Sequence, residues 1–254
     1  YYVNAGNVST NARLMNDISL ATECGATVGN WTPIGNSPNS FRGKFDGGNH
    51  TVSGLYIKDA TNQYQGLFGI LLGTVEHLNV NGVVDCPSTS NVGLLAGGLL
   101  GGNITDCTTA GSVIGLNYVG GISGSSSGKI SHVSNMATVN GKSIVGGIVG
   151  QLVKEIAYSI NSGAVTCIGL GGGIVGENHG TVSDCYNTGA VTASLAGGIA
   201  GFQRASSLKS CYNTADVTVN GVVKAGNAII GSNSGQISNN YYLSSDATVP
   251  TTNY

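Results

Sequence analysis

Charge is scarce in this sequence. Asp, Glu, Lys and Arg make up 9% of its 254 residues, against roughly 25% in an ordinary globular protein. The Lys and Arg residues are scattered singly and the formal net charge is −2, so the basic patch of a nucleic-acid-binding protein is missing. No apolar run approaches the roughly 18 residues of a membrane span. We therefore expect neither nucleic-acid binding nor membrane insertion of this chain.

Proline is also rare, with 4 residues beside 42 Gly. This balance excludes collagen and a Pro/Gly-rich linker, and a hydrophobic fraction of 41% argues against disorder. The sequence begins at Tyr1, with neither an initiator Met nor a signal peptide. We expect it to be a mature or excised part of a longer protein.

What the sequence does contain is an internal repeat. A Gly-ending motif recurs at intervals of 28, 27, 26, 26, 25 and 30 residues. Its copies are GLFG ending at Gly69, GLLAG at Gly97, VGGISG at Gly124, VGGIVG at Gly150, GGIVG at Gly176, GGIAG at Gly201 and AIIG at Gly231. Six or seven residues after each Gly comes an aliphatic residue: Val75, Ile104, Ile130, Ile156, Val182, Leu208 and Ile237.

Counting from that aliphatic residue aligns further positions. Position five holds Asn135, Asn161, Asn187 and Asn213. Position seven holds Gly111, Ala137, Gly163, Gly189 and Ala215, and position nine holds Val113, Val139, Val165, Val191 and Val217. Positions of equal parity share one face of a strand. Because this face collects Val and small residues, it should point to the interior, with the Asn amides bonded from copy to copy in a buried ladder.

A period of about 26 residues suits neither helix pairs nor propeller blades, which run to about 40 residues. Short Val, Ile and Thr runs broken by Gly, Asn and Ser are strand and turn signals. The sequence therefore predicts an all-β, right-handed parallel β-solenoid. Each repeat would form one coil of about three short strands, stacked on the next at roughly 4.8 Å.

Two stretches resemble a known family. VGGIVG followed by VSDCYNTGAVT is similar to the GLUG repeat of secreted and surface proteins of bacteria, which include IgA-specific metallopeptidases and adhesin-like proteins. WTPIGNSPNSFRGKFDGGNHTVSGLYI, residues 31–57, resembles the segment that precedes such repeats. The resemblance covers roughly residues 14–243 and implies an architecture, with no shared catalytic residues to transfer. The early repeats are degenerate, and Tyr241 and Tyr242 replace the NTG of the last one.

We expect a single domain over residues 1–254. Residues 1–63 would form degenerate coils and a partial N-terminal cap, residues 64–243 the GLUG-like repeats, and residues 244–254 a C-terminal tail.

The stretch IVGENHGTVSDCYNTGAVT, residues 174–192, could be mistaken for an active site. We expect its Glu177, His179 and Asp184 to be outward and solvated. Position two collects Asp106, His132, Tyr158, Asp184 and Ser210. Stacking would separate His132 from Ser210 by three coils, about 14 Å, whereas a catalytic triad needs contacts near 3 Å. We predict an outward polar column and no catalytic residues.

Metal and thiol chemistry are predicted to be absent as well. The four His show no His-x-His spacing and the Cys no CxxC spacing, so we expect no metal site and no cofactor. Asp46 and Asn49 could bind a cation, but a Gly-rich turn is the favoured interpretation. Position three holds Cys107, Val133, Ser159, Cys185 and Cys211, which is typical of a small core position. We expect most of the six thiols to be free and buried.

Three tyrosines are candidates for ligand stacking. Tyr186 and Tyr212 occupy position four of adjacent coils, and Tyr241 lies one coil further. Pointing outward, they would offer a stacking ladder for sugar rings; we favour the core or a corner.

The predicted function is that of a non-catalytic structural, adhesive or spacer module of a cell-surface protein, located outside the cell. End-to-end assembly into a filament is one version of it, since open coil edges are templates for strands. Partners would be further copies of the chain, or a glycan or protein of a host or cell surface. The alternative is a carbohydrate-binding or carbohydrate-cleaving β-helix.

Overall fold

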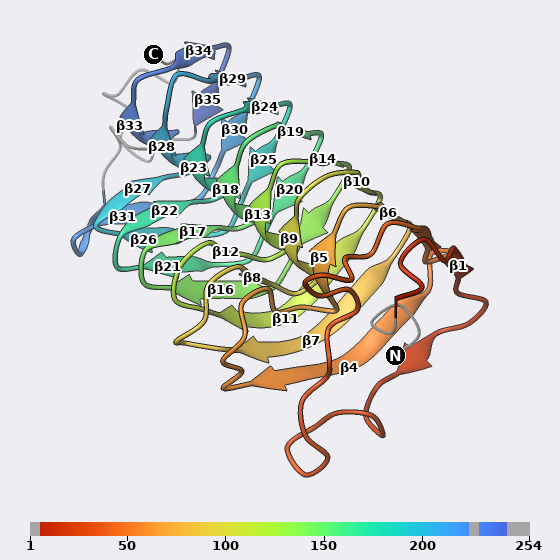
Figure 1. Ribbon diagram of the computed structural model, residues 1–254. Coiled ribbons are helices and arrows are strands. Elements are labelled where there is room, and N and C mark those ends of the chain that lie inside the picture. Colours follow the sequence, from red (N-terminus) through yellow and green to blue (C-terminus); the bar gives the residue numbers. More distant parts are fainter. Residues whose placement is uncertain (1–5, 224–228, 243–254) are drawn as a thin grey trace.

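The computed structural model describes residues 6–223 and 229–242. All regular structure in these residues is β-strand. Strands of successive coils pair side by side into stacked parallel sheets, so the chain forms the predicted β-solenoid (Figure 1). Over the described ranges no helix is long and apolar enough to cross a membrane.

Four sheets run along the solenoid. The first consists of β1 (Ala12–Arg13), β3 (Lys44–Asp46), β6 (Thr74–Glu76), β10 (Asn103–Thr105), β14 (Lys129–Ser131), β19 (Glu155–Ala157), β24 (Thr181–Ser183), β29 (Ser207–Lys209) and β34 (Gln236–Ser238). The second begins with β2 (Ile18–Ser19), β4 (Thr51–Lys58), β7 (Asn79–Asp85) and β11 (Thr108–Ile114). It continues with β15 (Ser134–Asn135), β16 (Thr138–Gly141), β20 (Ile160–Asn161), β21 (Val165–Cys167), β25 (Tyr186–Asn187), β26 (Val191–Ala193), β30 (Tyr212–Asn213), β31 (Val217–Val219), β32 (Val222–Val223) and β35 (Tyr241–Tyr242).

The other two sheets are shorter. The third consists of β8 (Val92–Gly93), β12 (Val119–Gly120), β17 (Ile144–Gly146), β22 (Leu170–Gly172) and β27 (Leu195–Gly197). The fourth consists of β5 (Phe68–Leu71), β9 (Ala96–Leu99), β13 (Ser123–Ser126), β18 (Val149–Leu152), β23 (Val175–Asn178), β28 (Ala200–Gln203) and β33 (Ile230–Asn233).

A central coil visits all four sheets, so the expectation of three strands per coil was too low. One coil runs through β17, β18, β19, β20 and β21 before β22 returns to the third sheet. The fourth strand reflects the fourth sheet, and the fifth arises because the long strands β7 and β11 are replaced, from β15 onward, by two short strands on either side of a turn. The Asn of position five ends the first of them, and its side chain bonds to the backbone two residues on.

The repeat register inferred from the sequence is the register of the first sheet. The aliphatic residues of consecutive coils are strand partners, from Val75 through Ile104, Ile130, Ile156, Val182 and Leu208 to Ile237. The same column extends one coil further toward the N-terminus, where Phe45 pairs with Val75. Strand pairs between coils are parallel, which stacks like positions on one another.

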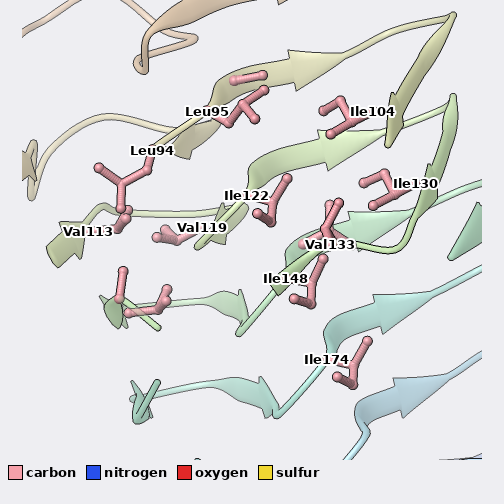
Figure 2. Close-up of a cluster of buried hydrophobic side chains, with 14 of the residues drawn as sticks. Leu94, Leu95, Ile104, Val113, Val119, Ile122, Ile130, Val133, Ile148 and Ile174 are labelled. Atoms are coloured by element: carbon pink, nitrogen blue, oxygen red, sulfur yellow. The ribbon is translucent and has the colours of Figure 1, made fainter. Parts of the chain in front are cut away.

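The interior is filled by columns of aliphatic side chains. Ile122, Ile148 and Ile174 lie one above another in successive coils, beside the column of Ile104 and Ile130 (Figure 2). All five are buried. Because each coil shields its neighbours, the hydrophobic core is continuous along the axis, which is the source of stability in repeat proteins.

The two ends of the predicted domain are described in part. β1 and β2 extend the first and second sheets beyond β3 and β4. Residues 1–5, at the start of the predicted cap, and residues 244–254, the predicted tail, lie outside the described residues.

Candidate functional site

The four asparagines of position five form a continuous column of hydrogen bonds inside the second sheet. The side-chain amide of Asn135 donates to Asn161, that of Asn161 to Asn187, and that of Asn187 to Asn213, each over 2.8 Å. At its first end, the Thr109 hydroxyl donates to Asn135 Oδ1 at 2.8 Å. All four asparagines have an exposed fraction of 0%.

Each amide also closes the turn of its own coil. Asn161 Nδ2 donates to the carbonyl of Gly163 at 2.8 Å, and Asn187 Nδ2 to that of Gly189 at 2.9 Å. In the opposite direction, Gly189 N donates to Asn187 Oδ1 at 3.3 Å. The buried amide groups are therefore paired both within and between coils, which avoids the roughly 1–3 kcal/mol penalty of an unpaired buried polar group.

The glycine pairs of the repeat make room for this column. A Cβ added to Gly147 would lie against the Asn161 amide, and one added to Gly173 against the Asn187 amide. The second Gly of VGGIVG is thus required because an Asn amide approaches its Cα from across the coil. The motif and the asparagine belong to one structural device.

The position-four tyrosines point outward, which corrects the placement that we favoured. Tyr212 is 37% and Tyr241 46% exposed, and Tyr186 is half-buried. Position four precedes the inward asparagine, so strand alternation turns it toward solvent. The rings of Tyr186 and Tyr212 stack at 5.3 Å with an interplanar angle of 12°. Since the two rings cover each other's faces, this pair presents ring edges to a ligand and is a poor platform for sugar stacking.

The position-two residues form an exposed corner with left-handed backbone. All five residues of the polar column, Asp106, His132, Tyr158, Asp184 and Ser210, have φ between 51° and 54° and are exposed. Asn49, His77 and Asn239 extend the same corner with φ of 64°, 51° and 55°. Asp, Asn and His are enriched at positive φ, but Tyr158 and Ser210 dilute that signal in the sequence of this column.

Within that corner, side chains contact residues of the same coil or of an adjacent one. His132 stacks on Tyr158 with ring centroids 5.1 Å apart, and Asp106 accepts a hydrogen bond from Thr105 at 3.0 Å. Ser210 lies three coils from His132 along the sheet register. No nucleophile, base and orienting group are brought together by this column.

Glu177 is buried, whereas the sequence predicted an outward, solvated side chain. His179 and Asp184 are exposed as expected, but Glu177 is only 4% exposed. Its carboxylate accepts hydrogen bonds from Arg204 at 2.6 Å and Gln151 at 3.0 Å, and lies 3.3 Å from His179. Both Gln151 and Arg204 come from neighbouring coils, and the sequence of one coil does not show what the next coil lays over it.

The protonation of Glu177 follows from these partners. Burial raises its pKa, but hydrogen bonds from Arg204, Gln151 and His179 lower it by more, so the pKa lies below that of an ordinary glutamate. Arg204 in turn lies 5.0 Å from the Phe202 ring centroid. Glu177 is thus held as a satisfied carboxylate, the opposite of a general acid whose pKa is raised.

Three residues near the start of the solenoid have the donor set of a metal site. Ligand atoms of Asp46, Glu76 and His77 lie within 4.8 Å of one another, and all three residues are half-buried. Cations of the protein already balance the carboxylates, because Lys44 lies 2.7 Å from Glu76 and Arg13 3.3 Å from Asp46. Extending the repeat back by one coil, to the pairing of Asp46 with Glu76, would have revealed this cluster from the sequence.

The stretch FDGGNHT, residues 45–51, contains a tight turn. Gly48 N donates to Asp46 Oδ1 at 2.9 Å, and His50 N donates to the Gly47 carbonyl at 2.8 Å. Gly48 and Asn49 have φ of 58° and 64°. Asp46 Oδ1 therefore closes the turn, as an Asx side chain commonly does.

The six cysteines are all buried and unpaired. Burial raises the pKa of Cys107 to about 12 and that of Cys167 to about 11, and it also raises the pKa of Cys185. A nucleophilic thiol needs the reverse, a lowered pKa in a partly exposed site. These thiols are packing groups.

Comparison with known proteins places the chain among solenoids. No family model matches it. It is 31% identical over 93 residues to a "Putative Gly-rich membrane protein" of Evansella cellulosilytica, and 35% identical over 99 residues to "Halomucin" of Haloquadratum walsbyi. These matches cover 36% and 37% of this chain, and 10% and 1% of the relatives, so the chain spans a small part of their length.

The structural likeness extends further along the chain. A crystal structure of a "putative immunoglobulin A1 protease" from Bacteroides ovatus superposes with a TM-score of 0.77, over 95% of this chain and 80% of that one. Sequence identity is 22%, so this likeness concerns the fold.

Proposed function

We propose that this chain is a non-catalytic structural module of a cell-surface protein, located outside the cell, which acts as a rigid spacer of the GLUG-repeat type. The observation that carries the proposal is the unbroken register of the first sheet from Val75 to Ile237. Every coil along it contributes one residue to the same inward column, so each added coil lengthens a stiff rod. The relatives named as a membrane protein and a halomucin support a surface location.

The same geometry argues against catalysis as the role of this chain. The polar residues of position two follow the axis instead of converging, and the Glu177 carboxylate is paired with its partners. Burial raises the pKa values of Cys107, Cys167 and Cys185. The Tyr186–Tyr212 stack also gives no support to a carbohydrate-cleaving groove. Adhesion and end-to-end assembly are finer versions of the proposal, in which the exposed tyrosine edges or the coil edges at the two ends make the contacts.

Removing one whole coil tests the spacer. Deleting residues 144–169 joins Ser143 to Leu170, the register partner of Ile144. The shortened chain should fold, and small-angle scattering should show a rod shorter by about 4.8 Å. The matched control deletes about half of that segment, which puts inward positions out of register and should abolish folding. A one-coil deletion that unfolds the protein as completely as the control would contradict a modular spacer.

Two further measurements address the finer versions. Electron microscopy of the purified protein would show filaments if the coils stack end to end, whereas single short rods would limit the proposal to a spacer. Incubation with polysaccharides and peptides should yield no cleavage. Turnover that is retained through purification and lost in Glu177→Gln would overturn the non-catalytic assignment.

A further inference from the structure

The regular strand column of the fourth sheet is interrupted in the coil before β5. Ile34 pairs with Phe68 and Phe41 pairs with Leu71. Phe68 and Leu71 are three residues apart in β5, whereas their partners in the preceding coil are seven residues apart. Residues 35–40, four more than separate Phe68 from Leu71, contain a loop that leaves the sheet. An excursion of this kind on a rigid scaffold is a usual place for a binding site.

This loop and the next one along the axis enclose a hollow of about 430 Å³. One wall comes from Thr32, Pro33 and Asn36, the other from Asn62, Gln63 and Tyr64. The volume falls within the roughly 300–1,000 Å³ of small-molecule sites. The hollow is therefore large enough for one or two sugar rings.

The lining is polar but uncharged. It contains no Asp, Glu, Lys, Arg or His. The side-chain amides of Asn36, Asn62 and Gln63 form no hydrogen bond to any described residue, whereas Gln65 is engaged with the Asn62 carbonyl at 2.7 Å. A free amide both donates and accepts hydrogen bonds, as a sugar hydroxyl does, and Pro33 and Ile70 add apolar surface.

From this combination we infer a binding site for a neutral carbohydrate between residues 32–37 and 62–65. The amides of Asn36, Asn62 and Gln63 meet the ligand hydroxyls, and Tyr64 and Pro33 contact its carbon face. A charged sugar is disfavoured because the lining offers no counter-ion for a carboxylate or phosphate that loses its water. This site lies in the N-terminal coils, whereas the tyrosines from Tyr186 to Tyr241 lie in the C-terminal coils. The site does not depend on those tyrosines.

The repeat itself supplies a matched control for Tyr64. Tyr64, Asn91 and Tyr118 occupy one corner in three successive coils, with φ of 64°, 59° and 52°. Backbone hydrogen bonds link this corner from coil to coil, from Gln65 N to the Asn91 carbonyl and from Val92 N to the Tyr118 carbonyl. Tyr118 shares the backbone setting and half-burial of Tyr64 but is not part of the hollow.

The experiment titrates the full chain with the methyl glycosides of glucose, galactose, mannose, N-acetylglucosamine and N-acetylgalactosamine, at millimolar concentrations, with sodium glucuronate as the anionic probe. Saturation-transfer NMR detects binding and calorimetry measures it. We expect at least one neutral glycoside to bind. Asn62→Ala should weaken that binding roughly tenfold through the loss of one good polar contact. Tyr64→Ala should weaken it roughly tenfold through the loss of the ring that contacts the carbon face of the sugar, whereas Tyr118→Ala should bind like the wild type.

Asn62 is exposed, so Asn62→Ala keeps the test decisive even if Tyr64→Ala fails to fold. Four outcomes would overturn the inference. Two concern the wild type: no neutral glycoside binds, or glucuronate binds more tightly than every neutral glycoside. The other two concern the variants: Asn62→Ala leaves binding unchanged, or Tyr118→Ala weakens binding as much as Tyr64→Ala does.

Discussion

The first coils and the central coils fill the same solenoid in different ways. Around β3 and β5 the interior is aromatic, with the Phe68 ring centroid 5.3 Å from that of Phe41 and 5.4 Å from that of Phe45. Between β14 and β31 the buried hydrophobic residues are aliphatic side chains and cysteines. The amide column from Asn135 to Asn213 runs through the same stretch.

The difference shows what repetition provides. A buried amide in a central coil is satisfied by its own copy in the next coil, so a polar group can lie in the core without a special partner. A coil whose neighbours differ from it in sequence cannot pair amides in this way, and large aromatic side chains fill its interior instead. Freed from strict register, the first coils also vary in loop length, and the hollow beside Tyr64 forms there. Five predictions test this contrast.

Removing aromatic bulk should have the largest effect. Phe68→Ala leaves a cavity among Phe41, Phe45 and their neighbours, and should lower the free energy of unfolding by about 3–5 kcal/mol. Because coils contact only adjacent coils, hydrogen exchange should show the damage near β3 to β9. Ile148→Val is the control, at about 1 kcal/mol. Protection lost equally along all coils would contradict local packing.

A larger side chain at position seven, the column of Gly and Ala residues, should lower the free energy of unfolding by nearly as much in the central coils. In Gly163→Val the added Cβ meets the Ala137 backbone carbonyl and comes within 3.0 Å of Asn135 Nδ2. We expect a loss of about 3 kcal/mol in urea unfolding, the upper end of overpacking. Thr192→Val, at an exposed position of β26, should be nearly neutral. Equal stability of the two variants would mean that the facing of position seven is misassigned.

Breaking the amide column should cost about 2–3 kcal/mol at an inner position. Asn187→Ala unpairs the facing groups of both Asn161 and Asn213. Asn213→Ala removes only one bond between coils and should cost about half as much. Thermal or chemical unfolding gives both values. If the end position were as costly as the inner one, the bonds between coils would contribute little.

Glu177→Gln should cost about 1–2 kcal/mol near neutral pH, discounted because Arg204 is 54% exposed. The pKa of Glu177 is lowered on folding, so its contribution is complete above the pKa of the unfolded chain and is lost as pH falls through the lower, folded value. The stability gap between wild type and variant should therefore close in acid. Glu155→Gln, whose carboxylate is 40% exposed beside Lys129, should show a smaller stability gap near neutral pH. A gap for Glu177→Gln that widens in acid would contradict the direction of the shift.

The smallest predicted effect is a gain in stability. Ser210→Gly should raise the free energy of unfolding by about 0.5–1 kcal/mol, because Ser210 has φ of 54° and left-handed backbone is unfavourable for residues with a Cβ. Ser207→Gly, within β29, should lose a similar amount, since Gly weakens a strand. Differential scanning calorimetry can resolve the pair. Destabilisation of both variants alike would show that the corner carries little strain.

Features that recur at a fixed spacing could be predicted from the sequence, whereas features that depend on contacts between particular coils could not. The period, the aliphatic register and the inward parity of position nine were readable because each recurs at a fixed spacing. The left-handed corner was hidden by its mixed composition, since Tyr158 and Ser210 are unusual there. The burial of Glu177 depends on side chains from two other coils, and the excursion at residues 35–40 occurs once, so neither forms a pattern.

The amide column also has a direction and two defined ends. Its donors all point toward the C-terminus, from Thr109 through Asn135 to Asn213, and the strand partner of Asn213 in the next coil is Tyr242. The chain of dipoles therefore starts with a hydroxyl donor and stops where an aromatic ring replaces the amide. A duplicated coil that carries its own asparagine would lengthen this series at any point between its ends without leaving an unmatched group. Solenoids of this type can consequently change length by whole coils in their middle, while the coils that terminate the series stay unique.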